Sequence, residues 1–395
     1  MLSQQIINTV KSTAPLLADE GENITRLFYK KLFSNHPELK NIFNLANQGK
    51  GDQARALAES VFLYASHIDE LDTLNPLVNR IAHKHASLQV SPDHYPIVGK
   101  FLLEAIKDHL KLKHDDPVLQ AWEAAYQALA NLFVRTEEHI YSTNEWKQGG
   151  WRGFRAFKID NIAKETDEIK SFLLRPIDGL PIAGFQPGQF VGVKVYPESS
   201  EYEEIRQYSI SSPSGESYYR ITVKAEAPGT ASAGHVSNYL HQARVGDELL
   251  LAPPTGDFVI ANPDADLAFI GGGIGITPLV SMLEEQVRHR SRLDTLVFVH
   301  CCQDKEHHAM RSELRALSKS KGFTYRVAYE RGDAADHIGY LDTPVLEKWL
   351  GGGKRDIYFC GPKPFMAALH MLLNGLGYAE EQLHYEIFGP RIRLN

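Results

Sequence analysis

The stretch Arg206-Gln207-Tyr208-Ser209-Ile210 lies near the middle of the 395 residues and separates two halves with different patterns. Upstream, apolar residues recur at helical spacing. Downstream, short apolar runs alternate with helical patterns and a glycine-rich turn. An arginine fork at the end of a predicted strand suits a phosphate group, and a tyrosine ring suits a flat stacking partner. The same residues would also suit an edge strand with a solvated arginine, so the flanking regions decide the interpretation.

The composition is typical of an ordinary soluble protein of two or three domains, with 43% hydrophobic and 23% charged residues. A net charge of −7 argues against nucleic acid and anionic membrane surfaces as partners. Cys301, Cys302 and Cys360 form no Cys-x-x-Cys pair, so neither a disulfide framework nor a zinc site is indicated. We expect a cytoplasmic monomer without an export signal and without integral membrane association.

Residues 1–146 are predicted to form an all-α domain, in which segment 81–88 contains two histidines. The neighbours of His85 at three and four residues are mostly apolar, and those of His83 are mostly polar. Because side chains at these spacings share a helix face, we expect His85 to point into the core and His83 into solvent. A lone inward histidine is more often held by one hydrogen bond than by a metal, so periodicity alone leaves both roles open.

A glycine-rich joint at residues 148–153 ends the helical pattern, and residues 151–262 are predicted to form an antiparallel β-barrel. Apolar or alternating runs indicate strands at 154–159, 168–174, 189–196, 205–211, 219–224 and 248–251. Segment 198–204 is predicted to be a solvated surface loop. Segment 234–240 begins a helix whose N-terminal amides would favour an anion, although a simply capped helix fits as well.

Residues 263–395 are predicted to form a doubly wound parallel sheet. A buried strand at 267–270 runs into Gly271-Gly272-Gly273-Ile274-Gly275-Ile276-Thr277-Pro278 and then a helix. Another strand at 356–359 leads into Cys360-Gly361-Pro362. Ligands of such sheets bind beyond the carboxyl ends of the strands, so both motifs are expected at one site. Taken alone, Cys360 would suit a small buried position.

Together these motifs resemble those of bacterial flavohaemoglobins over essentially the whole chain. The resemblance implies a globin domain with haem b, an FAD-binding barrel of the ferredoxin-NADP reductase type and a domain for NADH or NADPH. It implies nitric oxide dioxygenase activity, in which electrons pass through FAD to the haem and O2 and NO yield nitrate. Two alternatives remain: an oxygen-binding or sensing globin with a haem reductase, and an NAD(P)H-dependent flavin reductase that serves another acceptor.

The same resemblance assigns the haem site. It implies that His85 ligates the iron and that Tyr95 and Glu137 orient it, although Glu138 adjoins Glu137 and the sequence alone does not decide between them. A carboxylate behind the ligand would favour oxygen activation over oxygen carriage. The remaining assignments are Tyr29 and Gln53 beside the oxygen ligand, and Phe43, Leu57 and Lys84 in the pocket wall.

The reductase sites follow from the resemblance too. Phe190 stands where a tyrosine is common in close relatives, which keeps ring stacking and removes a hydroxyl group. No arginine cluster follows the strand at 296–300 to hold a 2′-phosphate, which favours NADH. The implied FAD residues are Phe190, Arg206, Gln207, Tyr208, Ser209, Val236, Ser237, Glu386, Ile387, Phe388, Gly389 and Pro390. The implied nicotinamide residues are Gly271, Gly272, Gly273, Ile274, Gly275, Ile276, Thr277, Cys360, Gly361 and Pro362.

Overall fold

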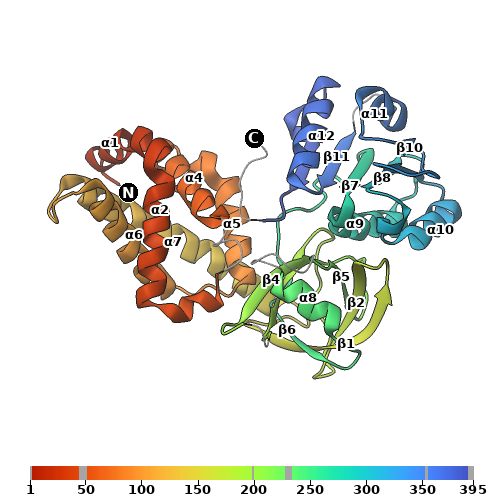
Figure 1. Ribbon diagram of the computed structural model, residues 1–395, viewed down its shortest axis with the longest axis horizontal. Coiled ribbons are helices and arrows are strands. Elements are labelled where there is room, and N and C mark those ends of the chain that lie inside the picture. The colour runs from red at the N-terminus through yellow and green to blue at the C-terminus, as the bar shows by residue number, and fades with distance from the viewer. Residues whose placement is uncertain (1, 44–50, 198–199, 227–233, 352–354, 390–395) are drawn as a thin grey trace.

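The computed structural model describes residues 2–43, 51–197, 200–226, 234–351 and 355–389. It has three parts in chain order: a helical part, an antiparallel sheet, and a parallel sheet flanked by helices (Figure 1). Over these described ranges, every helix is too short or too polar to cross a bilayer.

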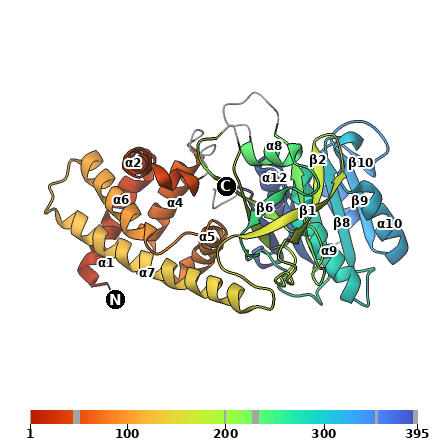
Figure 2. The same ribbon diagram turned by 90° about the horizontal axis from the view of Figure 1, so that it is seen from below.

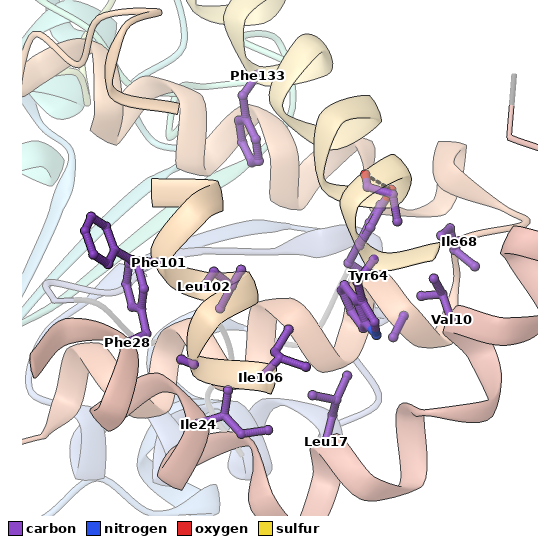
Figure 3. Close-up of a cluster of buried hydrophobic side chains, with 14 of the residues drawn as sticks. Val10, Leu17, Ile24, Phe28, Tyr64, Ile68, Phe101, Leu102, Ile106 and Phe133 are labelled. Carbon is purple, nitrogen blue, oxygen red and sulfur yellow. Dashed lines mark hydrogen bonds between the residues drawn. The ribbon is translucent and has the colours of Figure 1, made fainter. Parts of the chain in front are cut away.

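The helical part is built from amphipathic helices that bury one face each. Ser3 caps the first helix, since its hydroxyl accepts a hydrogen bond from the Ile6 amide. Figure 3 shows the core between the helices, where Phe28, Ile106 and Tyr64 are buried and the Tyr64 hydroxyl donates to a backbone carbonyl. The elements are α1 (Gln4–Ser12), α2 (Ala14–Asn35), η1 (Pro37–Asn41), α4 (Asp52–Ser66), η2 (Leu71–Leu74), α5 (Asn75–Ser87), α6 (His94–Leu110) and α7 (Pro117–Trp146).

The antiparallel sheet has six strands in the order β4-β3-β6-β1-β2-β5. They are β1 (Arg155–Lys164), β2 (Ile169–Pro176), β3 (Phe190–Val195), β4 (Glu204–Ser209), β5 (Tyr219–Lys224) and β6 (Glu248–Leu251), with helix α8 (His235–Gln242) before β6. Strand β1 runs five residues beyond the predicted end at Ile159. A β-bulge between Ile159 and Asn161 interrupts the alternation of apolar and polar residues on which that prediction depended.

The parallel sheet has the order β10-β9-β8-β7-β11-β12, and all six positions of its central strand β7 (Leu267–Gly272) are buried. Burial on both faces explains the continuous apolar run in the sequence. The other strands are β8 (Leu296–Cys302), β9 (Thr324–Tyr329), β10 (His337–Ile338), β11 (Asp356–Cys360) and β12 (Leu383–Glu386). The helices are η3 (Gly273–Gly275), α9 (Ile276–His289), η4 (Lys305–His307), α10 (Arg311–Lys321), α11 (Thr343–Leu350), α12 (Lys363–Gly375) and η5 (Glu380–Gln382).

Helix α5 lies on the side of the helical part that faces the antiparallel sheet in both views (Figures 1 and 2). The approach is close. A Cβ atom added to Gly192 in β3 would lie 2.1 Å from the carbonyl oxygen of Ser87 at the end of α5. Only glycine fits at this point, and the contact fixes where the helix meets the sheet.

Candidate functional site

A cavity of about 360 Å³ opens inside the helical part, between α2, α4, α5, α6 and α7. Its wall is mostly apolar and includes Phe43 and Leu57, while His85 enters from α5. Tyr29, Gln53, Lys84 and Tyr95 line the same cavity. The structure therefore gathers the residues expected around haem, and His85 points inward as predicted.

A hydrogen-bond network holds the side of His85 that faces away from the cavity. Its Nδ1 lies 2.7 Å from Oε1 of Glu137 and 3.1 Å from the hydroxyl oxygen of Tyr95. Tyr95 donates to the same carboxylate oxygen at 2.5 Å, and Glu137 is only 2% exposed. Because the carboxylate occupies Nδ1, Nε2 is the nitrogen available to a metal in the cavity.

The structure selects Glu137 rather than its neighbour for this network. Glu138 is exposed and forms an ion pair with Arg152, with a 2.9 Å bond from the Nη1 of the arginine. Burial, reinforced by the Glu137 charge, raises the pKa of the Tyr95 hydroxyl far above its usual range. Tyr95 therefore stays protonated and remains a hydrogen-bond donor to the carboxylate.

Helices α2 and α4 contribute Tyr29 and Gln53, two polar side chains, to the lining of the cavity. The ring of Tyr29 meets Phe43 edge-on with centroids 5.7 Å apart. Oε1 of Gln53 is buried without a hydrogen-bond partner among the described residues. A buried unsatisfied amide oxygen is costly, and a hydrogen-bond donor bound in the cavity would relieve it. A mostly apolar cavity whose lining includes an available imidazole nitrogen and a buried amide fits haem.

His83 does not face solvent, so that prediction was wrong. Its Nδ1 lies 2.5 Å from Oγ1 of Thr255 and accepts a 3.2 Å hydrogen bond from the amide of Gly256, both beyond β6. The polar character of this helix face reflects contact with a second domain rather than with water.

Strand β4 contains residues 206–209 of the stretch 206–210, called the central motif below. It pairs with β3, so that Phe190 lies opposite Ser209 and Val191 opposite Tyr208. Arg206 forms a 2.8 Å ion pair with Glu204 and donates to the carbonyl oxygen of Ile205. Glu204 is 2% exposed and lies in strand β4. The prediction that segment 198–204 is a solvated surface loop was therefore wrong at its last residue. Residues 198 and 199 lie outside the described residues.

Helix α8 begins beside this motif. His235 at its start lies 3.3 Å from the second carboxylate oxygen of Glu204, so one buried acid connects Arg206 with the helix N-terminus. Val236 is fully buried, and the hydroxyl of Ser237 donates to the carbonyl of Gly234. The arginine and the helix N-terminus could therefore share one anionic group.

The glycine-rich turn and the Cys-Gly-Pro motif lie side by side. Gly271 at the end of β7 pairs with Cys360 at the end of β11. A Cβ atom on Gly275 would lie 2.4 Å from the carbonyl oxygen of Cys360, which explains a glycine there. Cys360 is fully buried, and burial raises the pKa of its thiol, which favours the neutral form over the thiolate. The other implied residues lie at the end of β7, in η3, at the start of α9 and just before α12: Gly272, Gly273, Ile274, Ile276, Thr277, Gly361 and Pro362.

The C-terminal strand β12 connects this site with α5. Glu386 pairs with Cys360, and burial raises the pKa of the Glu386 carboxyl to about 7 against the opposing charge of Lys84. Lys84 donates a 2.7 Å hydrogen bond to the carbonyl of Gly389. Ile387 is buried and Phe388 is 43% exposed, which leaves its ring available to cover a ligand. Pro390 lies outside the described residues.

Sequence reasoning did not find the contacts between α5 and the second domain. Besides His83, the hydroxyl of Ser87 accepts a 3.0 Å hydrogen bond from Gln207 of the central motif. Each of these pairs is separated by more than a hundred residues, so local periodicity carries no signal for them. The one local indication was that His83 and Ser87 stand four residues apart on a shared polar face.

Three family models match successive parts of the chain: a globin over residues 26–132, an oxidoreductase FAD-binding domain over 157–260 and an oxidoreductase NAD-binding domain over 269–371. Flavohemoproteins of Oceanobacillus iheyensis and Bacillus subtilis are 43% and 41% identical to the chain. Their alignments cover 99% and 100% of this chain and 97% and 99% of the relatives.

Solved structures agree with these matches. Flavohemoglobin from Malassezia yamatoensis with bound FAD and heme superimposes with a TM-score of 0.87 at 26% identity, over 98% of this chain and 100% of that one. The flavohem-like FAD/NAD-binding domain of nitric oxide dioxygenase from Vibrio cholerae superimposes with a TM-score of 0.56 at 35% identity, over 60% of this chain and 100% of that one.

The predicted fold and the order of its three parts are thereby confirmed. Haem, FAD and a nicotinamide dinucleotide are confirmed as the cofactors that the three parts bind, and the activity is that of an oxidoreductase. The chain belongs to the flavohemoprotein family.

Proposed function

We propose that this flavohemoprotein is a nitric oxide dioxygenase, which uses NAD(P)H and O2 to oxidise NO to nitrate. The observation that supports the proposal most is the buried carboxylate behind His85. When bound, haem supplies a redox-active iron for oxygen chemistry, FAD divides an electron pair into single electrons, and NADH or NADPH supplies the hydride.

On the proximal side, His85 would hold the iron through Nε2. Glu137 accepts a hydrogen bond from Nδ1, which makes the imidazole a stronger electron donor. A strongly donating ligand favours O–O chemistry over reversible oxygen carriage. Tyr95 would keep the carboxylate in place, because its hydroxyl donates to the same oxygen atom.

Within the cavity, Tyr29 and Gln53 would offer hydrogen-bond donors that could orient O2 and stabilise negative charge there. Phe43 and Leu57 would exclude water from the pocket, and Lys84 would connect its rim with the C-terminal segment. Arg206, Gln207, Tyr208, Ser209, Phe190, Val236, Ser237 and residues 386–389 would hold FAD. The glycine-rich turn at 271–277 and Cys360-Gly361-Pro362 would hold the nicotinamide cofactor.

The proposal is tested by mixing the purified holoprotein with NADH and NO under air and measuring nitrate and NADH. Conversion of one NO and one O2 into one nitrate ion requires one electron. A hydride from NADH supplies two electrons, so two nitrate ions per NADH are expected. His85→Ala should abolish nitrate formation. Oxygen binding without nitrate formation would favour the carrier alternative. NADH oxidation that is undiminished in His85→Ala would favour a reductase that serves another acceptor.

The role of Tyr29 is tested separately. Loss of a hydrogen bond to a charged group costs about 1.5–3 kcal/mol, so Tyr29→Phe should release O2 roughly ten- to a hundredfold faster. Tyr64→Phe is the matched control, because Tyr64 lines the same cavity but donates to the carbonyl of Ala125. An O2 release rate in Tyr29→Phe no different from that of the control would make Tyr29 a packing residue only.

A further inference from the structure

Helix α5 presents His85 to the haem cavity and His83 to the flavin domain. Nδ1 of His83 receives two hydrogen-bond donors. The amide of Gly256 can only donate, so Nδ1 carries no proton and the hydroxyl of Thr255 donates to it as well. The ring proton therefore stands on Nε2, and one nitrogen atom of His83 holds two consecutive residues of the flavin domain.

The segment that His83 holds belongs to the wall of the expected flavin site. Thr255 and Phe190 exchange two backbone hydrogen bonds of 2.9 Å each, and a Cβ atom on Gly256 would lie 3.0 Å from the Phe190 ring. Phe190 is in turn paired with Ser209 of the central motif. The residue that His83 contacts is therefore hydrogen-bonded directly to Phe190, one of the residues expected to bind FAD.

Ser87 provides a second point of contact one helical turn further on. Its hydroxyl accepts a hydrogen bond from Gln207 in β4, and its carbonyl oxygen meets Gly192 in β3. Residues four apart lie on one helix face, so His83 and Ser87 together determine how α5 is oriented against the flavin domain. A single contact would leave the helix free to pivot.

We propose that His83 is a positioning residue for electron transfer from flavin to haem. It fixes the rotation and distance of α5, and therefore of His85, relative to the strands that bind the flavin. Electron transfer between two fixed sites slows steeply as their separation grows, so loosening this contact should slow haem reduction without affecting the entry of electrons from NADH. The proposal rests on the flavin-to-haem route of the family and does not depend on NO as the substrate.

The test follows flavin and haem absorbance separately after anaerobic mixing of the holoprotein with NADH. Losing one or two hydrogen bonds changes a docking equilibrium by a factor of about 5–30, so His83→Ala should slow haem reduction by about that factor. Flavin reduction should keep its rate. Thr255→Val should slow haem reduction less, because the amide of Gly256 still donates to His83. His139→Ala, at an exposed position on α7, is the matched control and should change neither rate.

Two further measurements separate positioning from general damage. His83→Gln should restore haem reduction to within about threefold of the parent, because an amide oxygen can accept in place of Nδ1. Hydrogen exchange of the Gly256 amide should quicken in His83→Ala and return towards the parent in His83→Gln. Unchanged haem reduction in His83→Ala would overturn the proposal, as would an equal slowing of flavin reduction. Restored Gly256 protection in His83→Gln without restored haem reduction would also overturn it.

Discussion

The flavin domain meets its two neighbours through different chemistry. Towards the globin, His83 and Ser87 of α5 form neutral hydrogen bonds with a hydroxyl, an amide and a carboxamide, and the ion pair of Arg152 with Glu138 of α7 is exposed. Towards the nicotinamide domain, Arg220 of β5 lies between Glu284 and Glu313, at 3.2 and 2.9 Å. Neutral hydrogen bonds depend on geometry, whereas ion pairs also respond to pH and salt. The first interface should therefore be sensitive to shape and the second to charge balance.

The acidic pair at the second interface is strongly perturbed. Burial raises the pKa of Glu284 to about 7, with Arg220 opposing the shift and Glu313 adding to it. The hydroxyl of Ser281 donates to the carbonyl of Ser212 across the same interface at 2.6 Å. Arg220 is therefore needed chiefly to neutralise the Glu284 carboxylate, whose side chain is only 14% exposed.

The largest effect is expected from Arg220→Ala. Removing one partner of a buried ion pair costs about 3 kcal/mol, because the other charge is left unpaired. Urea unfolding at pH 8 should show this loss, and the loss should shrink at pH 6, where Glu284 takes up a proton. Arg175→Ala, which breaks an exposed pair with Asp160 in the same domain, should cost less than about 1 kcal/mol. Equal costs for the two variants would contradict the charge-balance interpretation.

Gly192→Ala should produce the next largest effect, at the other interface. The new methyl group would collide with the Ser87 carbonyl, and such overpacking typically costs about 1–3 kcal/mol. Haem reduction by NADH should slow while flavin reduction stays unchanged. Gly184→Ala is the control, since a Cβ atom there meets nothing within 4 Å. Normal haem reduction in Gly192→Ala would show that the two domains tolerate displacement.

A smaller effect concerns pH. The folded pKa of Glu284 is raised above its ordinary value of 4.5 to about 7, so the folded state binds more protons between these values. The free energy of unfolding should fall as pH rises from about 4.5 to about 7 and then level off. The contribution of Glu284 to this fall should be about 1 kcal/mol, because the residue is coupled to neighbouring charges and is partly exposed. Glu284→Gln should remove that slope in urea unfolding between pH 5 and pH 8. An unchanged slope would exclude Glu284 as its source.

The smallest effect is expected from Arg288→Ala. Arg288 forms an ion pair with Glu216 across the second interface but is 43% exposed. Exposed pairs contribute little, so the free energy of unfolding should stay within about 0.5 kcal/mol of the parent. A larger loss in the same urea experiment would mean that the exposed ion pair of Arg288 with Glu216 stabilises the interface as much as the ion pairs of Arg220 do.

The fold could be predicted because its periodicities are local. The uninterrupted apolar run of β7 and the glycines after it identify a buried parallel strand and its turn within about ten residues. The end of β1 could not be predicted, because the bulge brings two polar residues, Asp160 and Asn161, next to each other. A regular strand would alternate, and the second of these positions would be apolar. Bulges depend on the partner strand, which the local sequence does not contain.

The candidate site shows the same limit. The inward orientation of His85 followed from its apolar neighbours, and the resemblance supplied Glu137 and Tyr95. The polar face of His83 was assigned to solvent because a domain interface and a water-exposed surface share the same composition. Which of the two exists depends on Thr255, which lies 172 residues away. The functional roles of these residues stay predictions until the variants are measured.

Four residues of α5 meet four different surroundings within little more than one turn: His83 the flavin barrel, Lys84 the C-terminal segment, His85 the haem cavity and Ser87 the central motif. One inserted residue would rotate everything after it by about 100°. A substitution would disturb one of these contacts at a time. An insertion or deletion would turn every later side chain of the helix away from its present contact. Length variation among natural or engineered homologues should therefore be absent from α5 and concentrated in the connecting loops.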